Sequence, residues 1–524
     1  MDVEPLLRLS ALGIYFHAIY ISLTFGLPVA IGVMLWLWGR TGDSEYLRAA
    51  KLMTMVLVVN FALGAIAGTL VEFGLVQVWP GVNLAIATFA FAPLALELIA
   101  FANEIAFLIL FVVTLGRVRA VVSMLILAVY AVFAYFSGML ITTVNSWLQA
   151  PWGVGPLAKT LYPFMPEYGP LAVDVPKLVA VKAGAMAMGQ PLSILVQQPG
   201  LAEKVGIVLY DPLVAMVSPY AIVSIFHNIL AGILIGMAIA AAGWAYRYYK
   251  TGDPKYLKLV KPLIIVIAIL FVIQTPIVSH FMGRAVVEYN PTKFALMEGA
   301  KETFNNPIIA LIAYHDPNKP ILGFDHFYAK CEELGETTIG DIASALGLGV
   351  YLGALGVDAS NIAGVKLKDV CIADLQKAER LMLVVHYAYY AKVITAIIGG
   401  LAAATLFFYF IKVPALNPLA VRVASLLGDE KKRVFLLTLL VLAGTVIPAV
   451  LGWYVREVGR KPWTVYGLLY PEELATPVPY ATSWPFLAFA YLVILAVNIG
   501  GLLALYIVAT RGYKFLELLK RGVS

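Results

Sequence analysis

Cysteine and charge are both scarce in this chain of 524 residues. It contains two cysteines, and Asp, Glu, Lys and Arg together supply 13% of its residues, whereas 61% are hydrophobic. Two cysteines are too few for a cysteine-ligated metal cluster or a disulfide framework. The low charge and a mean hydropathy of +0.87 exclude an ordinary soluble domain and give no basis for a nucleic-acid partner. The composition predicts a polytopic membrane protein.

A secretory signal peptide is also missing from the start of this sequence. Asp2 and Glu4 occupy the region where such a peptide carries basic residues, and the first apolar run is longer than a signal peptide requires. We therefore expect the first apolar run to remain as a membrane span.

Long apolar runs, by contrast, are abundant. Nine are long enough to cross a bilayer as helices, and they lie near residues 11–38, 52–77, 84–115, 120–147, 213–245, 260–282, 384–411, 434–455 and 484–510. The predicted fold is an all-α membrane bundle of nine transmembrane helices. Its expected divisions are helices 1–6 in residues 1–282, a large outer loop in 283–383, and helices 7–9 in 384–524.

Short connections between the runs differ in charge from one side of the membrane to the other. Basic residues follow the first, third, fifth, seventh and ninth runs, at Arg40, Arg48, Lys51, Arg117, Arg119, Arg247, Lys250, Lys255, Lys258, Lys261, Arg422, Lys431, Lys432, Arg433, Arg511, Lys514, Lys520 and Arg521. All of these segments fall on one side, and short basic loops stay in the cytoplasm. We predict a multi-pass protein of a prokaryotic plasma membrane, with its N-terminus outside and its C-terminus cytoplasmic.

Two long connections remain, and both are predicted to lie outside. Residues 148–212 are rich in proline and glycine, and residues 283–383 form a polar loop of domain size. Cys331 and Cys371 both lie in the second loop, forty residues apart. A disulfide can persist in an outer compartment, and two free thiols are the alternative.

Two carboxylates interrupt the third apolar run. Glu97 and Glu104 are seven residues apart, about two helical turns, so both leave one helix face roughly 10 Å apart along the axis. A charge in hydrocarbon costs at least ~2.5 kcal/mol, so such residues usually face a bundle interior. We interpret the pair as part of a proton path or a metal site. Two protonated, hydrogen-bonded structural carboxyls are the alternative.

Six histidines are present, and three of them, His17, His227 and His386, lie within spans or at their ends. A single histidine on a transmembrane helix is often an interhelical hydrogen-bond donor. Several histidines with buried glutamates instead indicate iron ligation, because imidazole is the common axial ligand of haem. No CxxCH motif occurs, so any haem would be held non-covalently. These features leave open a membrane redox protein and a proton-coupled transporter.

Five motifs follow one another along the spans. The first span contains YFHAIYISLTFG around His17, and the second contains NFALG followed by Glu72 and Phe73. The third reads APLALELIAF and then Glu104, the fourth ends in NSWLQAP, and the eighth ends in Glu457 followed by GRKPW. In this order they closely resemble subunit I of the cytochrome bd quinol:oxygen oxidases, whose last motif reads GRQPW. The resemblance covers all nine spans and the large loop.

This resemblance implies an activity, cofactors and partners. Members of the family belong to respiratory chains, where they oxidise a membrane quinol and reduce O₂ to water. They carry one low-spin haem b and a close pair of high-spin haems, expected here to be haem b or haem d. The resemblance implies a second membrane subunit, either subunit-II-like or another subunit-I-like chain. Small single-helix subunits can also belong to such a complex.

The resemblance also implies haem ligands, position by position. His17 matches the ligand of one high-spin haem, and Glu457 matches the ligand of the other. Glu97 matches the glutamate beside the first site, where a carboxylate can ligate iron or relay a proton. Glu104 matches the carboxylate on the proton route, and His227, in SIFHNILAG, matches the histidine of the low-spin haem.

Further matches lie at the outer side. Lys293 and Glu298 match a lysine and a glutamate implicated in quinol oxidation. Arg460 can pair with Glu457 or with a haem propionate, because guanidinium matches carboxylate bidentately. Trp463 belongs to the same GRKPW motif and is a candidate cofactor contact.

Two positions depart from the family pattern. The family usually has one more residue between the paired glutamates of the third span, which would rotate them about 80° apart instead of about 20°. Its seventh span carries Arg-x-Met, whose methionine is the second axial ligand of the low-spin haem. Tyr390 and Lys392 stand at those positions here. Lysine ligates iron only as the neutral amine, and otherwise its stem lets the ammonium reach the membrane surface.

The second departure leaves alternatives open. Either His227 and Lys392 hold an unusual low-spin haem, or that haem is five-coordinate or absent. The chain is then a haem-bearing subunit I, or a subunit-I-like paralogue that has lost some haem and quinol roles and acts as a structural partner. A proton-coupled transporter without haem is the third candidate, and it would show no Soret band.

Overall fold

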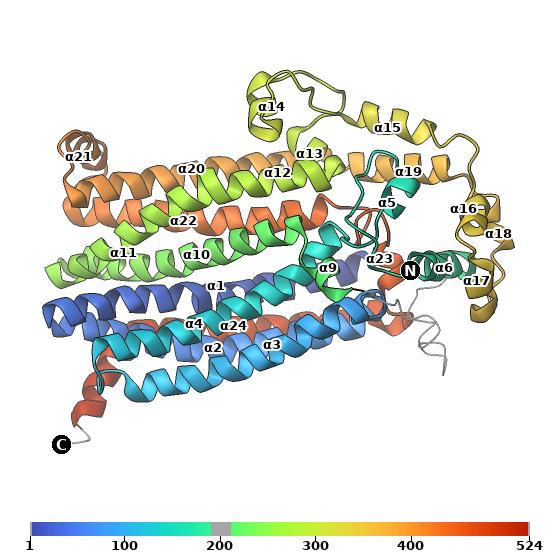
Figure 1. Cartoon of the computed structure of the whole chain (residues 1–524). Helices are drawn as coiled ribbons and strands as arrows, with labels where there is room; N and C mark the ends of the chain where they lie inside the picture. The colour runs from blue at the N-terminus through green and yellow to red at the C-terminus, as the bar shows by residue number, and fades with distance from the viewer. Residues whose placement is uncertain (1–2, 190–210, 522–524) are drawn as a thin grey trace.

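The computed structural model describes residues 3–189 and 211–521. Within them the regular elements are helical, and nine helices are long and apolar enough to cross a membrane. These helices lie alongside one another in an elongated bundle (Figure 1). The all-α fold with nine candidate spans, predicted from the sequence, is confirmed.

The structure extends most spans beyond the apolar runs. They are α1 (Glu4–Thr41), α2 (Ser44–Val78), α3 (Pro80–Thr114), α4 (Ala120–Gln149), α10 (Pro219–Thr251), a sixth span built from α11 (Pro254–Ile273), the π-helix η1 (Gln274–Val278) and α12 (Ser279–Tyr289), then α20 (Met382–Ile411), α22 (Glu430–Val458) and α24 (Trp484–Arg521). Hydropathy marks the apolar part of a helix, whereas its hydrogen bonds continue through polar turns at each end. The first span, for example, begins at Glu4 and continues to Thr41, where Gly42 ends it with a φ of 69°.

The fifth span begins later than the apolar run predicts. Residues Pro212–Met216 form a separate short helix, α9, and α10 starts at Pro219 after Ser218. The Ser218 hydroxyl accepts a hydrogen bond from the backbone N–H of Ala221. Serine at the N-cap followed by proline at the first helical position is a strong start signal, and here it outweighs the hydropathy of the preceding residues.

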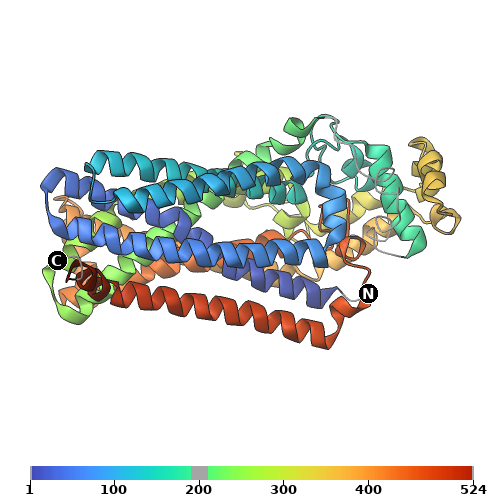
Figure 2. The same ribbon diagram turned by 90° about the horizontal axis from the view of Figure 1, so that it is seen from below.

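The two ends of the bundle differ. The N-terminus and the long connections gather at one end, and the C-terminus lies at the other (Figures 1 and 2). We call the first the loop end. Its helices are α5 (Leu157–Leu161), α6 (Val175–Met188), α13 (Pro291–Glu298), α14 (Pro307–Tyr314), α15 (Phe324–Glu332), α16 (Ile339–Ala345), α17 (Gly349–Leu355), α18 (Ser360–Ala363), α19 (Leu367–Glu379), α23 (Pro471–Leu474) and η2 (Pro479–Thr482); α21 (Asn417–Ser425) lies at the opposite end.

A disulfide joins two helices of the loop end. Cys331 of α15 and Cys371 of α19 are bonded, with their Cα atoms 5.7 Å apart. Of the two alternatives that the sequence left open, the structure has the disulfide. The bond closes a loop of forty residues and so restricts the unfolded chain.

Glycine allows two pairs of spans to approach closely. A Cβ atom on Gly26 of α1 would lie 2.5 Å from the Cα of Gly236 on α10, and Gly399 of α20 meets Gly444 of α22 in the same way. Small residues are common where membrane helices pack backbone to backbone. The first contact brings the helix that carries His17 against the helix that carries His227.

Candidate functional site

Glu457 lies in the last turn of α22, where it contacts polar groups of α4 and of the segment that follows α22. Its Oε2 is 2.5 Å from a guanidinium nitrogen of Arg460. Its Oε1 accepts hydrogen bonds from the side-chain amides of Asn145, at 3.3 Å, and Gln149, at 3.5 Å. Asn145 and Gln149 both belong to α4, so the NSWLQAP motif and the GRKPW motif meet at this carboxylate.

Arg460 is buried but incompletely paired. Its side chain is 6% exposed, and one terminal nitrogen is bonded to Glu457. Nε and Nη1 are buried without a hydrogen-bond partner in the part of the chain that the structure describes. A buried unsatisfied donor costs free energy, so these two nitrogens fit an anionic group such as a propionate carboxylate.

Arg456 is a member of this cluster that the sequence analysis did not single out. It donates hydrogen bonds to Asn145 Oδ1 at 2.5 Å, to Ser224 Oγ of α10 at 2.6 Å and to Ser146 Oγ at 3.3 Å. An arginine inside a span, beside a candidate ligand, is the signal that could have identified it. Its contacts connect α4, α10 and α22.

Lys293 of α13 reaches the same cluster from the outer loop. It is 1% exposed, and its Nζ donates to Gln149 Oε1. Burial holds the pKa of Lys293 well below its usual range, and the nearby Arg456 and Arg460 act in the same direction, against the attraction of Glu457. The neutral amine is therefore favoured at this position.

Glu298 ends the same short helix but faces other partners. The Tyr390 hydroxyl donates to its Oε2 at 2.8 Å. Burial raises the pKa of Glu298, while the Tyr390 hydrogen bond and His386 oppose the rise. His386 itself lies with Nδ1 2.8 Å from the carbonyl of Met297. Lys293 and Glu298 thus have different partners and are not paired with each other.

His227 is oriented by the π-helix of the sixth span. Its Nδ1 lies 3.2 Å from the side-chain amide nitrogen of Gln274 and 3.5 Å from the Ser279 hydroxyl. Metal-bound histidines usually make such a contact through their second nitrogen, so Nε2 is the nitrogen suited to iron. The same Gln274 amide nitrogen also donates to the backbone carbonyl of His227, at 3.3 Å, and the buried Gln274 Oε1 has no partner among the described residues. π-Helical turns often mark functional sites, but hydropathy does not reveal them.

Lys392 is half-buried and turned towards α22. A Cβ atom on Gly452 would lie 3.5 Å from its Nζ, and the charge of Lys392 acts on His227. The side chain therefore occupies the interhelical region between α20 and α22.

His17, Glu97 and Glu104 lie in the first half of the chain. The His17 ring packs on Gly68 of α2, where a Cβ atom would lie 2.8 Å from Cε1. Glycine thus makes room for the imidazole. Ser137 of α4 donates to Glu97 Oε1 at 3.3 Å. Glu104 is 4% exposed, as expected for a carboxyl that faces the bundle interior.

Trp463 lies in the packed core of the loop end. It is fully buried, and its indole N–H donates to the Tyr162 hydroxyl at 3.2 Å. The rings of Tyr162 and Tyr466 pack edge to face against it. These contacts hold the segment that follows the Glu457–Arg460 pair, and the backbone N–H of Trp463 donates to the Arg460 carbonyl at 3.2 Å.

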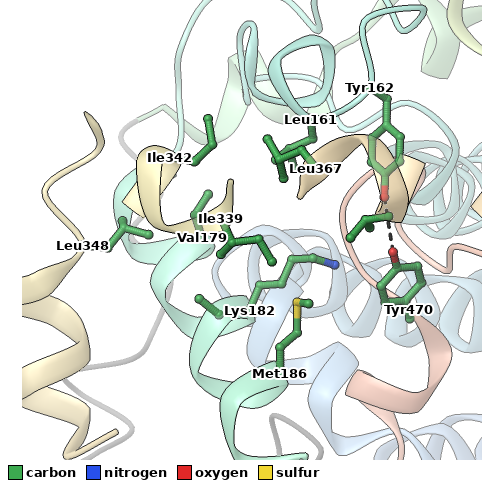
Figure 3. Close-up of a pocket in the computed structure, with 12 residues that line it drawn as sticks. Leu161, Tyr162, Val179, Lys182, Met186, Ile339, Ile342, Leu348, Leu367 and Tyr470 are labelled. Carbon is green, nitrogen blue, oxygen red and sulfur yellow. Dashed lines mark hydrogen bonds between the residues drawn. The ribbon is translucent and has the colours of Figure 1, made fainter. Parts of the chain in front are cut away.

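A separate apolar cavity of about 60 Å³ lies between α5, α6, α16 and α19. Figure 3 shows Lys182 of α6 extending along it towards Tyr470, and its Nζ is 4.1 Å from the centre of that ring. Lys182 also lies 3.3 Å from Glu473 Oε1. The charge is thus compensated within the loop end, and none of the candidate residues from the sequence lines this cavity.

Comparison with known proteins covers nearly the whole chain. The family model for cytochrome bd terminal oxidase subunit I matches residues 8–513. The "Putative cytochrome bd menaquinol oxidase subunit I" of Bacillus subtilis (strain 168) is 26% identical over 310 residues, 58% of this chain and 59% of that protein. The cytochrome bd-II ubiquinol oxidase subunit 1 of Escherichia coli (strain K12) is 29% identical over 144 residues, 27% of this chain and 28% of that protein.

Both alignments therefore span less than two thirds of these relatives. The bd oxidase of Geobacillus thermodenitrificans shares the fold, with a TM-score of 0.67 and 20% identity over 98% of this chain and 100% of that one. Because one family model extends across the nine spans and the loop end, this protein belongs to the cytochrome bd terminal oxidase subunit I family.

Proposed function

We propose that this chain is the haem-bearing subunit I of a bd-type terminal oxidase, which oxidises a membrane quinol and reduces O₂ to water. The observation that carries the proposal is the cluster around Glu457. There a candidate iron ligand is held by two amides and an arginine, and that arginine keeps two buried nitrogens for an anion. The relatives are named for two different quinols, so we propose a membrane quinol as the substrate class.

Three side chains would hold the cofactors. His17 and Glu457 would each ligate a high-spin haem, Glu97 would lie beside the first, and His227 would ligate the low-spin haem b. Bound haem would supply the redox-active iron that passes single electrons to O₂. The cradle over Gly68 for His17 and the orientation of His227 by Gln274 support these assignments.

The residues of α13 would handle the quinol. Oxidation of a quinol releases two electrons and two protons, and the neutral amine that burial favours at Lys293 can accept one of the protons. Glu298 is not paired with Lys293 and can contact the other hydroxyl of the quinol. Glu104, buried in α3, would relay protons towards the oxygen site, where four are consumed for each O₂ reduced to two waters.

Lys392 bears on the low-spin haem and on the alternative function. Its position against Gly452 and near His227 allows two roles. The neutral amine can be the second ligand of the haem iron, or the ammonium can prevent a second ligand from binding there. In the second case the chain would be a subunit-I-like partner with fewer haems. A Lys392→Met variant should then create a six-coordinate His/Met haem of higher potential, visible in the reduced spectrum.

The decisive experiment is a reduced-minus-oxidised spectrum of the purified complex, with pyridine haemochrome quantification and quinol-driven oxygen consumption. Three haems per chain with turnover are expected. Fewer haems without turnover would favour the structural paralogue, and a missing Soret band would favour a haem-free transporter. The same preparation would reveal the partner, which we propose is a second membrane subunit, with or without single-helix subunits.

Orientation requires its own test. We propose that the loop end faces outwards and the basic end faces the cytoplasm of a prokaryotic cell, because short basic loops stay inside. The native cysteines are paired, so introduced cysteines can be labelled selectively. Asn318→Cys at the loop end should react with an impermeant reagent from outside, and Lys431→Cys should not; the reverse pattern would contradict the orientation.

A further inference from the structure

Two histidines from different helices meet beside the sixth span. His280 belongs to α12, and His315 follows α14, thirty-five residues later. Their Nε2 atoms are 3.0 Å apart, and their rings are within 9° of parallel. Both side chains are at least partly exposed to the surroundings. Neither histidine has a role in the proposed oxidase chemistry.

The backbone at His315 is unusual. Its φ is 60°, a left-handed conformation that residues other than glycine adopt uncommonly and that asparagine tolerates better than most. His315 ends α14, and its N–H bonds to the carbonyl of Leu311. The fold therefore keeps a histidine where glycine would fit with less strain. Its imidazole is thereby directed against His280.

We propose that His280 and His315 form a two-histidine binding site for a late first-row divalent metal ion such as Cu²⁺ or Zn²⁺. Imidazole nitrogen is a preferred ligand of these ions. In the metal-free pair, the short contact requires one ring to donate its N–H to the other. A metal ion would replace that proton and connect α14 to the membrane span through two coordinate bonds.

The spacing of the two nitrogens fits this ligand class. With metal–nitrogen bonds of about 2.05 Å, two imidazoles lie about 2.9 Å apart at a 90° angle and about 3.4 Å apart at a tetrahedral angle. The observed 3.0 Å lies between these values. The nearly parallel rings, with centroids 5.2 Å apart, point their Nε2 atoms at each other, so each partly exposed ring must turn by about 35–45° to direct both lone pairs at one ion. Arg284, whose charge acts on His280, lies one turn further along α12 and provides no ligand. Water would complete the coordination.

The site can be tested on the complete complex, purified through a tag without histidine. Cu²⁺ is the probe, and electron paramagnetic resonance reports the number of nitrogen ligands through their hyperfine splitting. We expect one tightly bound Cu²⁺ per chain with two nitrogens. His280→Gln and His315→Asn should each lose one nitrogen and weaken Cu²⁺ binding by about tenfold or more. Asparagine is chosen at 315 because it tolerates the left-handed backbone.

A matched control is available in the same loop. His326→Asn changes another histidine of the loop end, outside the pair, and should leave the Cu²⁺ signal unchanged. An unaltered thermal unfolding transition and haem spectrum would show that each variant is folded. Equal Cu²⁺ binding by wild type and both pair variants, or a wild-type signal without two coupled nitrogens, would overturn the proposal. Displacement of the bound Cu²⁺ by Zn²⁺ would support the proposal further.

Discussion

Glu457 and Glu104 are both carboxylates of membrane spans, but their surroundings differ. Glu457 is bonded to Arg460 and two amides, and Lys293 contacts one of those amides. Glu104 is almost completely buried, and no ion pair with it occurs in residues 3–189 and 211–521. The first region sets two arginines, Arg456 and Arg460, beside one carboxylate, whereas the second has a buried carboxyl without an ion pair in the described residues.

This difference separates two kinds of site. Two arginines beside a single carboxylate leave positive charge that an anionic group can neutralise, so the Glu457 region suits the binding of a charged cofactor. An isolated buried carboxyl has no partner that fixes its ionisation, so it suits the uptake and release of a proton. The five predictions below test this division, from the largest expected effect to the smallest.

Glu457→Ala should have the largest effect. It leaves Arg460, with 6% of its side chain exposed, without a counter-charge, and loss of one partner of a buried pair costs about 3–5 kcal/mol. Glu457 is itself about one-third exposed, so we expect about 3 kcal/mol, together with loss of one haem. Thermal unfolding and pyridine haemochrome quantification measure the two effects. Glu472→Ala, an exposed carboxylate of α23, is the control and should change neither.

His17→Ala should remove one high-spin haem while the bundle stays folded. The ring packs on Gly68 between α1 and α2, and the spans are held by contacts far from it, such as Gly26 with Gly236. The haem content per chain should fall by one, with a transition temperature near that of wild type. Full haem content and full oxygen-reductase activity would make His17 a structural residue. His326→Asn again provides a histidine control.

Lys293→Met should change stability in a pH-dependent way. The pKa of Lys293 is depressed in the folded protein, so the unfolded chain binds more protons and wild-type stability rises with pH up to the ordinary lysine pKa of about 10.4. Methionine does not titrate, so the stability of the variant does not vary with pH through this position. The gain in melting temperature over wild type should be largest near pH 7 and shrink towards pH 10. Parallel wild-type and variant curves would mean that the lysine is not buried as a neutral amine.

The same variant tests the role of α13 in quinol oxidation. Lys293→Met and Glu298→Gln should slow quinol oxidation much more than the reaction of the pre-reduced enzyme with O₂. Lys301→Met, at an exposed lysine just beyond α13, is the matched control. Unchanged quinol kinetics in both variants would leave α13 without this role.

Glu104→Gln should have the smallest effect on stability. Glutamine keeps the shape and polarity of a protonated carboxyl, and no cation loses its partner, so we expect a change within about 1 kcal/mol. Oxygen reduction should nevertheless slow, because an amide cannot relay a proton. Stopped-flow reaction of the pre-reduced enzyme with O₂ measures this step. An unchanged rate would identify Glu104 as a structural carboxyl and remove the distinction between the two regions.

The sequence alone determined the nine candidate spans and pointed to several candidate site residues. Backbone groups in lipid must be hydrogen-bonded within a helix, so nine long apolar runs leave few alternatives to a helical bundle. A carboxylate or histidine within such a run is costly and therefore conspicuous, which is why Glu104 and His227 became candidates. Glu457 lies just beyond the eighth run and became a candidate only through the motif that follows it. Polar helix ends carry no such signal, and the spans were accordingly predicted too short.

Only the tertiary structure decided which side chains meet. The contacts of Glu457 with Asn145, of His227 with Gln274, and of His280 with His315 join residues from different helices, far apart in the chain. They depend on the rotation and axial position of each helix. Hydropathy does not encode these, because lipid and protein interior are similarly apolar and the packing is set by local fit between side chains.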